Sequence, residues 1–155
     1  MYPELVTLDL PLLGEVTITS FGVMMVAAFL GANYVMRRRL RELDGDAKLA
    51  DDIMIVALVG GLVGAKLYYV VLYWQLASVD PLRILFSRGG LVWYGGFIGG
   101  TLAVVALAWW REDTTVPFAA DLVAPALALG YGLGRVGCFL VGDDYGRPTD
   151  SWIGI

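Results

Sequence analysis

The sequence contains no histidine, a single cysteine and few charged residues. Only 17% of its 155 residues are charged, with 11 Lys and Arg against 15 Asp and Glu. Histidine is the commonest general base and metal ligand, so any acid–base chemistry must use other side chains. The lone Cys138 excludes an internal disulfide and a multi-cysteine metal site. The net charge of −4 gives no electrostatic footprint for nucleic acid, and we expect neither a cofactor nor a metal.

Hydrophobic residues are in excess. They make up 58% of the chain, and the mean hydropathy is +0.69, whereas soluble domains are about 45–50% apolar. A small soluble core cannot absorb this excess. Four apolar stretches, at about 17–36, 53–74, 91–110 and 117–139, approach or reach the ~20 residues of a spanning helix. We therefore predict an all-α integral membrane protein with about four transmembrane helices, in a single membrane domain over residues 1–155.

The distribution of basic residues predicts that the N-terminus lies outside. Residues 1–16 carry no Lys or Arg, whereas the segment after the first predicted span carries five: Arg37, Arg38, Arg39, Arg41 and Lys48. The positive-inside rule makes this segment cytoplasmic and both ends of the chain extracytoplasmic. A nucleic-acid patch is the weaker reading of the arginine run. Residues 1–16 are predicted to form an outer lead-in, with a short strand or hairpin turning at Leu13-Gly14, and residues 140–155 an outer turn.

Glycine recurs at four-residue spacing in three of the four predicted helices. The pairs are Gly60 and Gly64, Gly95 and Gly99, Gly96 and Gly100, and Gly130 and Gly134. Such spacing lets membrane helices approach closely, so tight packing is the expected role and room for a lipid chain is the alternative. Residues 132–137 (GLGRVG) also match the G-x-G-x-x-G pattern. A dinucleotide site requires a strand before that pattern, and here it falls in a predicted membrane helix, so we reject this reading.

Two cations lie toward the outer ends of predicted spans. Lys66 is about two-thirds along the second span, away from the glycine face, where an ionised lysine costs roughly 2.5–3.5 kcal/mol. It either snorkels outward or lines a polar cavity open to the outer leaflet, and we favour the cavity. Arg135 lies near the outer end of the fourth span and is followed by Asp143 and Asp144. A salt-bridged turn is the alternative to a functional site there.

Four segments together resemble one family. Residues 134–147 (GRVGCFLVGDDYGR) resemble the signature GR-x-G-N/C-F-x-N-G-x-x-x-G of the bacterial prolipoprotein diacylglyceryl transferases. Residues 89–100 (GGLVWYGGFIGG), 20–39 and 61–71 are similar to further parts of that family, in matching order. The resemblance implies transfer of the diacylglyceryl group of phosphatidylglycerol to the lipobox cysteine of a lipoprotein precursor signal peptide. It also implies a site in the bacterial cytoplasmic (inner) membrane, facing the outer leaflet.

The resemblance also suggests roles for residues of this chain. Arg135 would bind the lipid phosphate. The other implied substrate-binding residues are Lys66, Gly95, Gly96, Gly137, Gly142 and Gly146. Since the family often has histidine where this chain has Tyr94, the candidates for the base are Tyr94, Asp143 and Asp144. The chain also departs from the family at five further positions. The family has tyrosine where this chain has Phe21, arginine at Lys66, asparagine at Cys138 and Val141, and glutamate at Asp143. Cys138 is interpreted as a packing residue.

The family has about seven spans, and this sequence ends after the fourth. Three explanations compete: a truncated product, a half completed by a second polypeptide, or a paralogue that binds lipid without catalysis. The first reading is a transferase-family protein with phosphatidylglycerol, membrane lipid and lipoprotein precursors as partners. The second is a non-catalytic module that binds anionic lipid or assembles with a membrane partner. A channel or transporter subunit is the third, and only Lys66 favours it.

Overall fold

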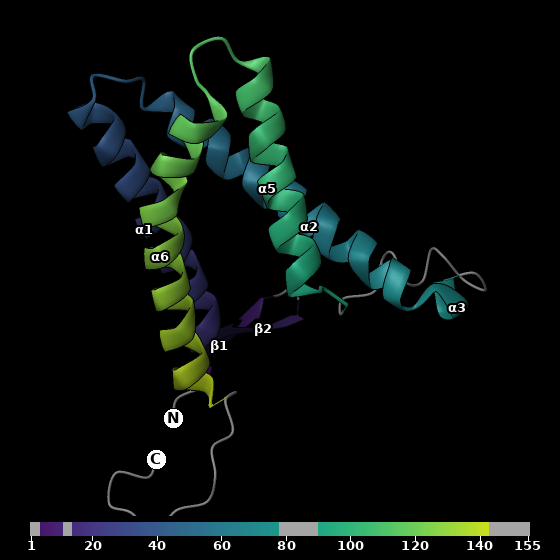
Figure 1. The fold of residues 1–155 in the computed structure, drawn as a ribbon. Helices are drawn as coiled ribbons and strands as arrows, with labels where there is room; N and C mark the ends of the chain where they lie inside the picture. The colour runs from purple at the N-terminus through teal and green to yellow at the C-terminus, as the bar shows by residue number, and fades with distance from the viewer. Residues whose placement is uncertain (1–3, 11–13, 78–89, 143–155) are drawn as a thin grey trace, which may run out of the picture. The chain divides into compact units, whose positions relative to one another are not determined.

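The chain forms a short hairpin followed by long helices. The computed structural model describes residues 4–10, 14–77 and 90–142. The elements, shown in Figure 1, are β1 (Glu4–Leu10), β2 (Gly14–Thr19), α1 (Ser20–Glu42), α2 (Lys48–Leu72), α3 (Trp74–Ala77), α5 (Trp93–Trp110) and α6 (Val116–Val141). By length and composition α1, α2, α5 and α6 can each cross a membrane. The prediction of a helical membrane protein with about four spans is confirmed.

The helices do not end where the apolar stretches end. The first apolar stretch stops near position 36, but α1 continues to Glu42. Arg38 and Arg39 each contact the Glu42 carboxylate, at 3.2 and 3.4 Å, and such pairs support the last helical turns. Hydropathy marks where the hydrocarbon begins, whereas backbone hydrogen bonds carry the helix on into the polar region. Residues 17–19, which we placed in the first span, belong instead to β2.

The described residues form two compact units, which we treat separately. The first takes its residues from Met1–Tyr34 and Pro125–Ile155, and the second is Val35–Ala124. The boundary between them falls inside α1 and inside α6. In α6 it coincides with Pro125, which has no N–H for the carbonyl of Asp121, so the helical ladder lacks one hydrogen bond at that point.

Glycines hold α2 against α5 in the second unit, where the two helices lie side by side (Figure 1). Gly60 and Gly64 of α2 face Gly99 of α5, and Gly64 also faces Gly95. A Cβ on Gly64 would stand 2.7 Å from the Cα of Gly99, and a Cβ on Gly60 would stand 2.8 Å from the carbonyl oxygen of Gly99. These two backbones are therefore in direct contact, as the spacing of the glycines predicted. We name these four residues the glycine seam.

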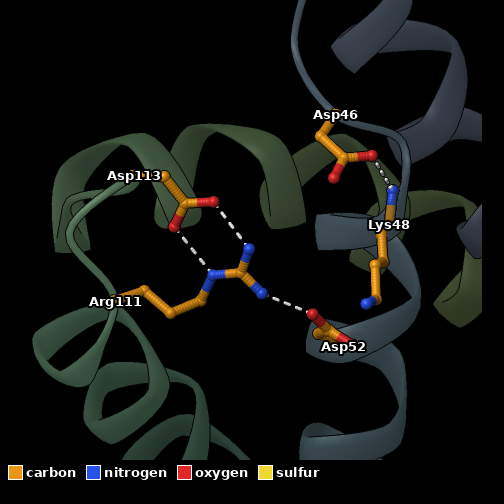
Figure 2. Close-up of polar contacts among 5 residues, drawn as sticks. All are labelled: Asp46, Lys48, Asp52, Arg111 and Asp113. Atoms are coloured by element: carbon orange, nitrogen blue, oxygen red, sulfur yellow. Dashed lines mark hydrogen bonds and ion pairs between the residues drawn. The ribbon is translucent and has the colours of Figure 1, made fainter.

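Charged residues join the ends of three helices in the second unit. Arg37 of α1 forms a two-pronged pair with Asp51 of α2, with Nε at 2.9 Å from Oδ1. Figure 2 shows Arg111, which follows α5, between two carboxylates. Its Nε and Nη2 donate to Asp113 at 2.7 and 2.6 Å, and its Nη1 donates to Asp52 of α2. Planar guanidinium forks match carboxylates in this way. The ends predicted to be cytoplasmic therefore lie together.

Candidate functional site

The signature arginine lies in the first unit, on α6. Arg135 is exposed and has an interaction partner in the structure. Two residues further on, Gly137 is buried against α1, where a Cβ would stand 3.1 Å from Cβ of Met24 and 3.2 Å from Cδ2 of Phe21. A glycine at position 137 therefore lets α6 approach α1 closely and fixes the helix that presents Arg135.

Gly142 ends α6. Its φ is +73°, a left-handed conformation that costs glycine little and other residues more. Its N–H donates to the carbonyls of Cys138 and Phe139, at 3.0 and 3.3 Å. Helices commonly end on such a glycine. The sequence interpretation gave Gly142 a substrate role, and its geometry additionally gives it the task of directing the chain out of the helix.

Two predicted site glycines lie at the start of α5, in the second unit. Gly95 is buried in the glycine seam, where a Cβ would collide with Gly64 and with Cβ of Tyr68. Gly96 has more room, because the nearest atom to its Cβ position is the carbonyl oxygen of Gly61 at 3.5 Å. A packing role is therefore established for Gly95 by contact, whereas Gly96 has space for a slightly larger group.

Lys66 lies beside the seam, on α2. It is half-buried, and its Nζ stands 5.7 Å from the centroid of the Tyr69 ring, within the range of a cation–π attraction. The Tyr69 ring is itself held in place by Gly90, whose φ is +77° and whose Cβ position is filled by that ring. The ring of Tyr73 packs on it at 4.7 Å. The lysine is thus next to a fixed aromatic face.

Tyr94 lies in the first turn of α5, directly before Gly95. Its side chain is 65% exposed, and its ring meets that of Trp93 edge-on at 5.2 Å. Trp93 in turn stacks on Phe97, with centroids 5.5 Å apart. The backbone just before α5 is tied to α2, because the N–H of Val92 donates to the carbonyl of Ala65 at 3.3 Å.

The remaining predicted site residues, Asp143, Asp144 and Gly146, lie outside the described residues. Among the described ones, the second unit contains Lys66, Tyr94, Gly95 and Gly96, and the first contains Arg135, Gly137 and Gly142. In the described residues, no group of three or more Asp, Glu, His and Cys could hold a metal ion.

Sequence reasoning missed several residues that organise the second unit. Gly90 and Tyr69 were overlooked, although a glycine pair directly before a predicted helix is a signal for a special backbone conformation. Asp51 and Asp52 were also overlooked as partners of arginines. Their position at the start of the second span, on the side predicted to carry Arg37, was the available signal.

These observations define a multi-pass helical membrane protein that carries a signature arginine on its fourth spanning helix. The family model for prolipoprotein diacylglyceryl transferase matches residues 9–155. The chain therefore belongs to the prolipoprotein diacylglyceryl transferase family, as the resemblance of its signature predicted.

Individual relatives agree with this assignment. The chain is 35% identical over 147 residues to phosphatidylglycerol–prolipoprotein diacylglyceryl transferase 2 of Clostridium perfringens, covering 92% of this chain and 57% of the relative. It is 36% identical over 145 residues to the phosphatidylglycerol–prolipoprotein diacylglyceryl transferase of Trichormus variabilis, covering 89% and 49%. It is 33% identical over 139 residues to the enzyme of the same name from Synechococcus elongatus, covering 89% of this chain and 48% of the relative. The chain thus spans about half the length of these relatives.

Proposed function

We propose that this chain takes part in diacylglyceryl transfer from phosphatidylglycerol to the lipobox cysteine thiol of lipoprotein precursors. The observation that carries the proposal is the family match over residues 9–155, together with an exposed Arg135 at the signature position of α6. The thiolate sulfur attacks the glyceryl carbon that bears the phosphate ester, so that a C–S bond forms as the C–O bond breaks. The electron pair leaves with glycerol 1-phosphate, and the thiol proton passes to a base.

Arg135 is the proposed phosphate ligand. A guanidinium binds two phosphate oxygens at once, and negative charge grows on the leaving phosphate as the C–O bond breaks. The packing of Gly137 against α1 supports this role, because it fixes the helical turn that carries Arg135.

Lys66 is the proposed second cation of the donor site. Its contact with the Tyr69 ring supports this role, since a fixed aromatic face restricts where the ammonium can go. Tyr94, Asp143 and Asp144 are the proposed candidates for the base that takes the thiol proton, because a thiolate is the required nucleophile and the chain has no histidine. The proposed substrate-binding glycines of the signature are Gly137, Gly142 and Gly146.

We propose that the site faces the outer leaflet of the bacterial cytoplasmic membrane. The arginines that end α1 support this orientation, because they belong on the cytoplasmic side. The ion pairs of Arg37 and Arg111 support it further, since they gather the ends of three helices on that same side. The opposite ends, where Lys66 and Arg135 lie on their helices, would then be extracytoplasmic.

The test is a lipid-binding and transfer assay on three arginine variants. A charge-assisted pair is worth roughly 1.5–3 kcal/mol, so Arg135→Ala should weaken phosphatidylglycerol binding by ~10- to 100-fold. Arg135→Lys should recover only part of this loss, because an ammonium lacks the fork. The control is Arg41→Ala, which removes an exposed arginine in the last turn of α1. Binding of zwitterionic lipid should change far less.

The outcomes separate the possible roles of this arginine. Diacylglyceryl transfer is read by mass spectrometry, with a lipobox peptide in phosphatidylglycerol liposomes. If Arg135→Ala folds and keeps its affinity for phosphatidylglycerol, the donor-site assignment is wrong, and the arginine serves only as a salt-bridge partner of Asp143 or Asp144.

A second candidate function is binding of anionic lipid, or assembly with a membrane polypeptide, without catalysis by this chain. The exposed Arg135 on α6 favours it, because an arginine can bind a lipid phosphate whether or not transfer follows. This alternative predicts phosphatidylglycerol binding that depends on Arg135, without any diacylglyceryl-peptide. Transfer that appears only when the C-terminal half of a relative is supplied would show that activity needs a second polypeptide.

A further inference from the structure

The N-terminal hairpin is amphipathic, and its apolar side is exposed. The register pairs Val6 with Ile18 and Thr7 with Thr17. Neighbouring residues along a strand point to opposite sides of the sheet, so the Val6–Ile18 pair and the Thr7–Thr17 pair lie on opposite faces. Val6 is 49% exposed and Ile18 is 40% exposed. The two threonine hydroxyls are 3.4 Å apart, within hydrogen-bonding distance.

The antiparallel pairing continues along both strands, with Leu8 opposite Val16 and Asp9 opposite Glu15. Of the described side chains, Val6 and Ile18 make one face of the hairpin aliphatic, and the hydroxyl groups of Thr7 and Thr17 lie on the other. An isolated two-stranded hairpin is marginally stable in water, so its apolar face needs a covering.

The position of the hairpin indicates what covers that face. β2 ends at Thr19 and α1, a candidate membrane span, begins at Ser20. The Thr19 hydroxyl accepts a hydrogen bond from the N–H of Gly22 at 3.1 Å, which caps the helix and fixes the junction. Exposed apolar residues continue beyond the junction at Phe21, Val23 and Val26. The apolar face of the hairpin is therefore followed along the chain by exposed apolar residues of the first candidate span.

We propose that the hairpin is an interfacial membrane element whose Val6–Ile18 face enters the bilayer at the N-terminal end of α1. Its depth would be about 5–10 Å, where the headgroups meet the acyl chains, as for other amphipathic interfacial segments. The threonine face remains in water. The Val6–Ile18 pair carries no charge, so the hairpin binds through apolar contact and requires no anionic lipid. The inference is independent of the proposed transferase function.

The experiment measures which face meets lipid. Single cysteines replace Val6, Ile18, Thr7 or Thr17 in a full-length Cys138→Ala background and carry an environment-sensitive fluorophore. The protein is reconstituted in phosphatidylcholine vesicles, with shallow doxyl-labelled phosphatidylcholine as the lipid quencher and iodide as the aqueous quencher. The threonine positions are matched controls on the same two strands. Two positions on each face keep the comparison intact if one variant does not fold.

Position decides the expected result. Labels at Val6→Cys and Ile18→Cys should be quenched by doxyl lipid at least about twofold more than labels at the threonine positions, with the reverse order for iodide. The same result in vesicles with and without phosphatidylglycerol supports binding through apolar contact. Equal quenching of both faces would overturn the proposal. Protection of the Val6 and Ile18 labels from both quenchers would also overturn it, because protein would then cover that face.

Discussion

Adding one methyl group to the glycine seam should loosen α2 from α5, and the same addition elsewhere should not. In Gly64→Ala the new Cβ would collide with the carbonyl oxygen of Gly95 and stand 2.7 Å from the Cα of Gly99, whereas ordinary contact begins at 3.4 Å. These neighbours are backbone atoms of α5, so no flexible side chain can move aside. The helices would have to separate locally by more than about 0.7 Å, and a gap of ~0.5–1 Å already forfeits a quarter to a half of the dispersion energy of the affected contacts.

The expected magnitude follows from two opposing effects. Overpacking a close contact costs about 1–3 kcal/mol, whereas replacing glycine by alanine in a helix gains up to about 1 kcal/mol. Gly64→Ala should therefore lower the free energy of unfolding by about 1–2 kcal/mol. Gly132→Ala is the matched control, because no described atom beyond its own stretch of helix lies within 4 Å of its Cβ position. That variant should be neutral or more stable by up to about 1 kcal/mol.

Unfolding of the two variants in detergent micelles, followed by tryptophan fluorescence or circular dichroism, provides the measurement. Gly64→Ala should unfold at a lower denaturant concentration than the wild type, and Gly132→Ala should not. If Gly64→Ala proves as stable as Gly132→Ala, the close approach of α2 and α5 at the seam is not a source of stability, and the reasoning from contact distances fails.

Three further predictions concern topology and charge. Cysteines replacing Glu4 and Asp44 in the Cys138→Ala background should differ in intact cells: an impermeant maleimide should label position 4 only, and the opposite pattern would reverse the topology. Hydrogen bonds from Arg111 hold the pKa of Asp113 below its ordinary value of 3.8. That carboxylate therefore contributes its full stability above this pH, and the stability difference between wild type and Asp113→Asn should shrink in a denaturation series as the pH falls below about 4, vanishing once the carboxyl of the folded protein is protonated. Lys66→Met should weaken phosphatidylglycerol binding about tenfold, whereas Lys48→Met should not; equal affinities would favour a lysine that only snorkels.

The sequence by itself determined the class of protein and the number of its spans. A membrane helix satisfies its own backbone hydrogen bonds, so each span is specified by its own apolar residues and needs no knowledge of its neighbours. The same local logic identified the glycine pairs and the lead-in hairpin. It did not locate the helix ends, because α1 continues through Arg38 and Arg39 to Glu42 beyond the apolar stretch. The signature around Arg135 determined the family because its residue order is specific.

Only the tertiary structure decided which residues meet. The spacing of Gly60, Gly64 and Gly95 is the same kind of signal as that of Gly130 and Gly134. Yet the first three are packed against the backbone of the facing helix, whereas no described atom beyond its own stretch of helix lies within 4 Å of the Cβ position of Gly134. Small residues permit close approach without specifying a partner, since the partner depends on how whole helices pack.

The same limit applies to charge. Arg111 binds Asp52, a residue 59 positions away, and this contact exists only because α5 and α2 run side by side. Arg37 likewise binds a carboxylate on another helix, because the turn between α1 and α2 brings it to Asp51. A sequence shows how many charges it has and near which span they lie. Which carboxylate each arginine binds is decided by the packing of the helices that carry them.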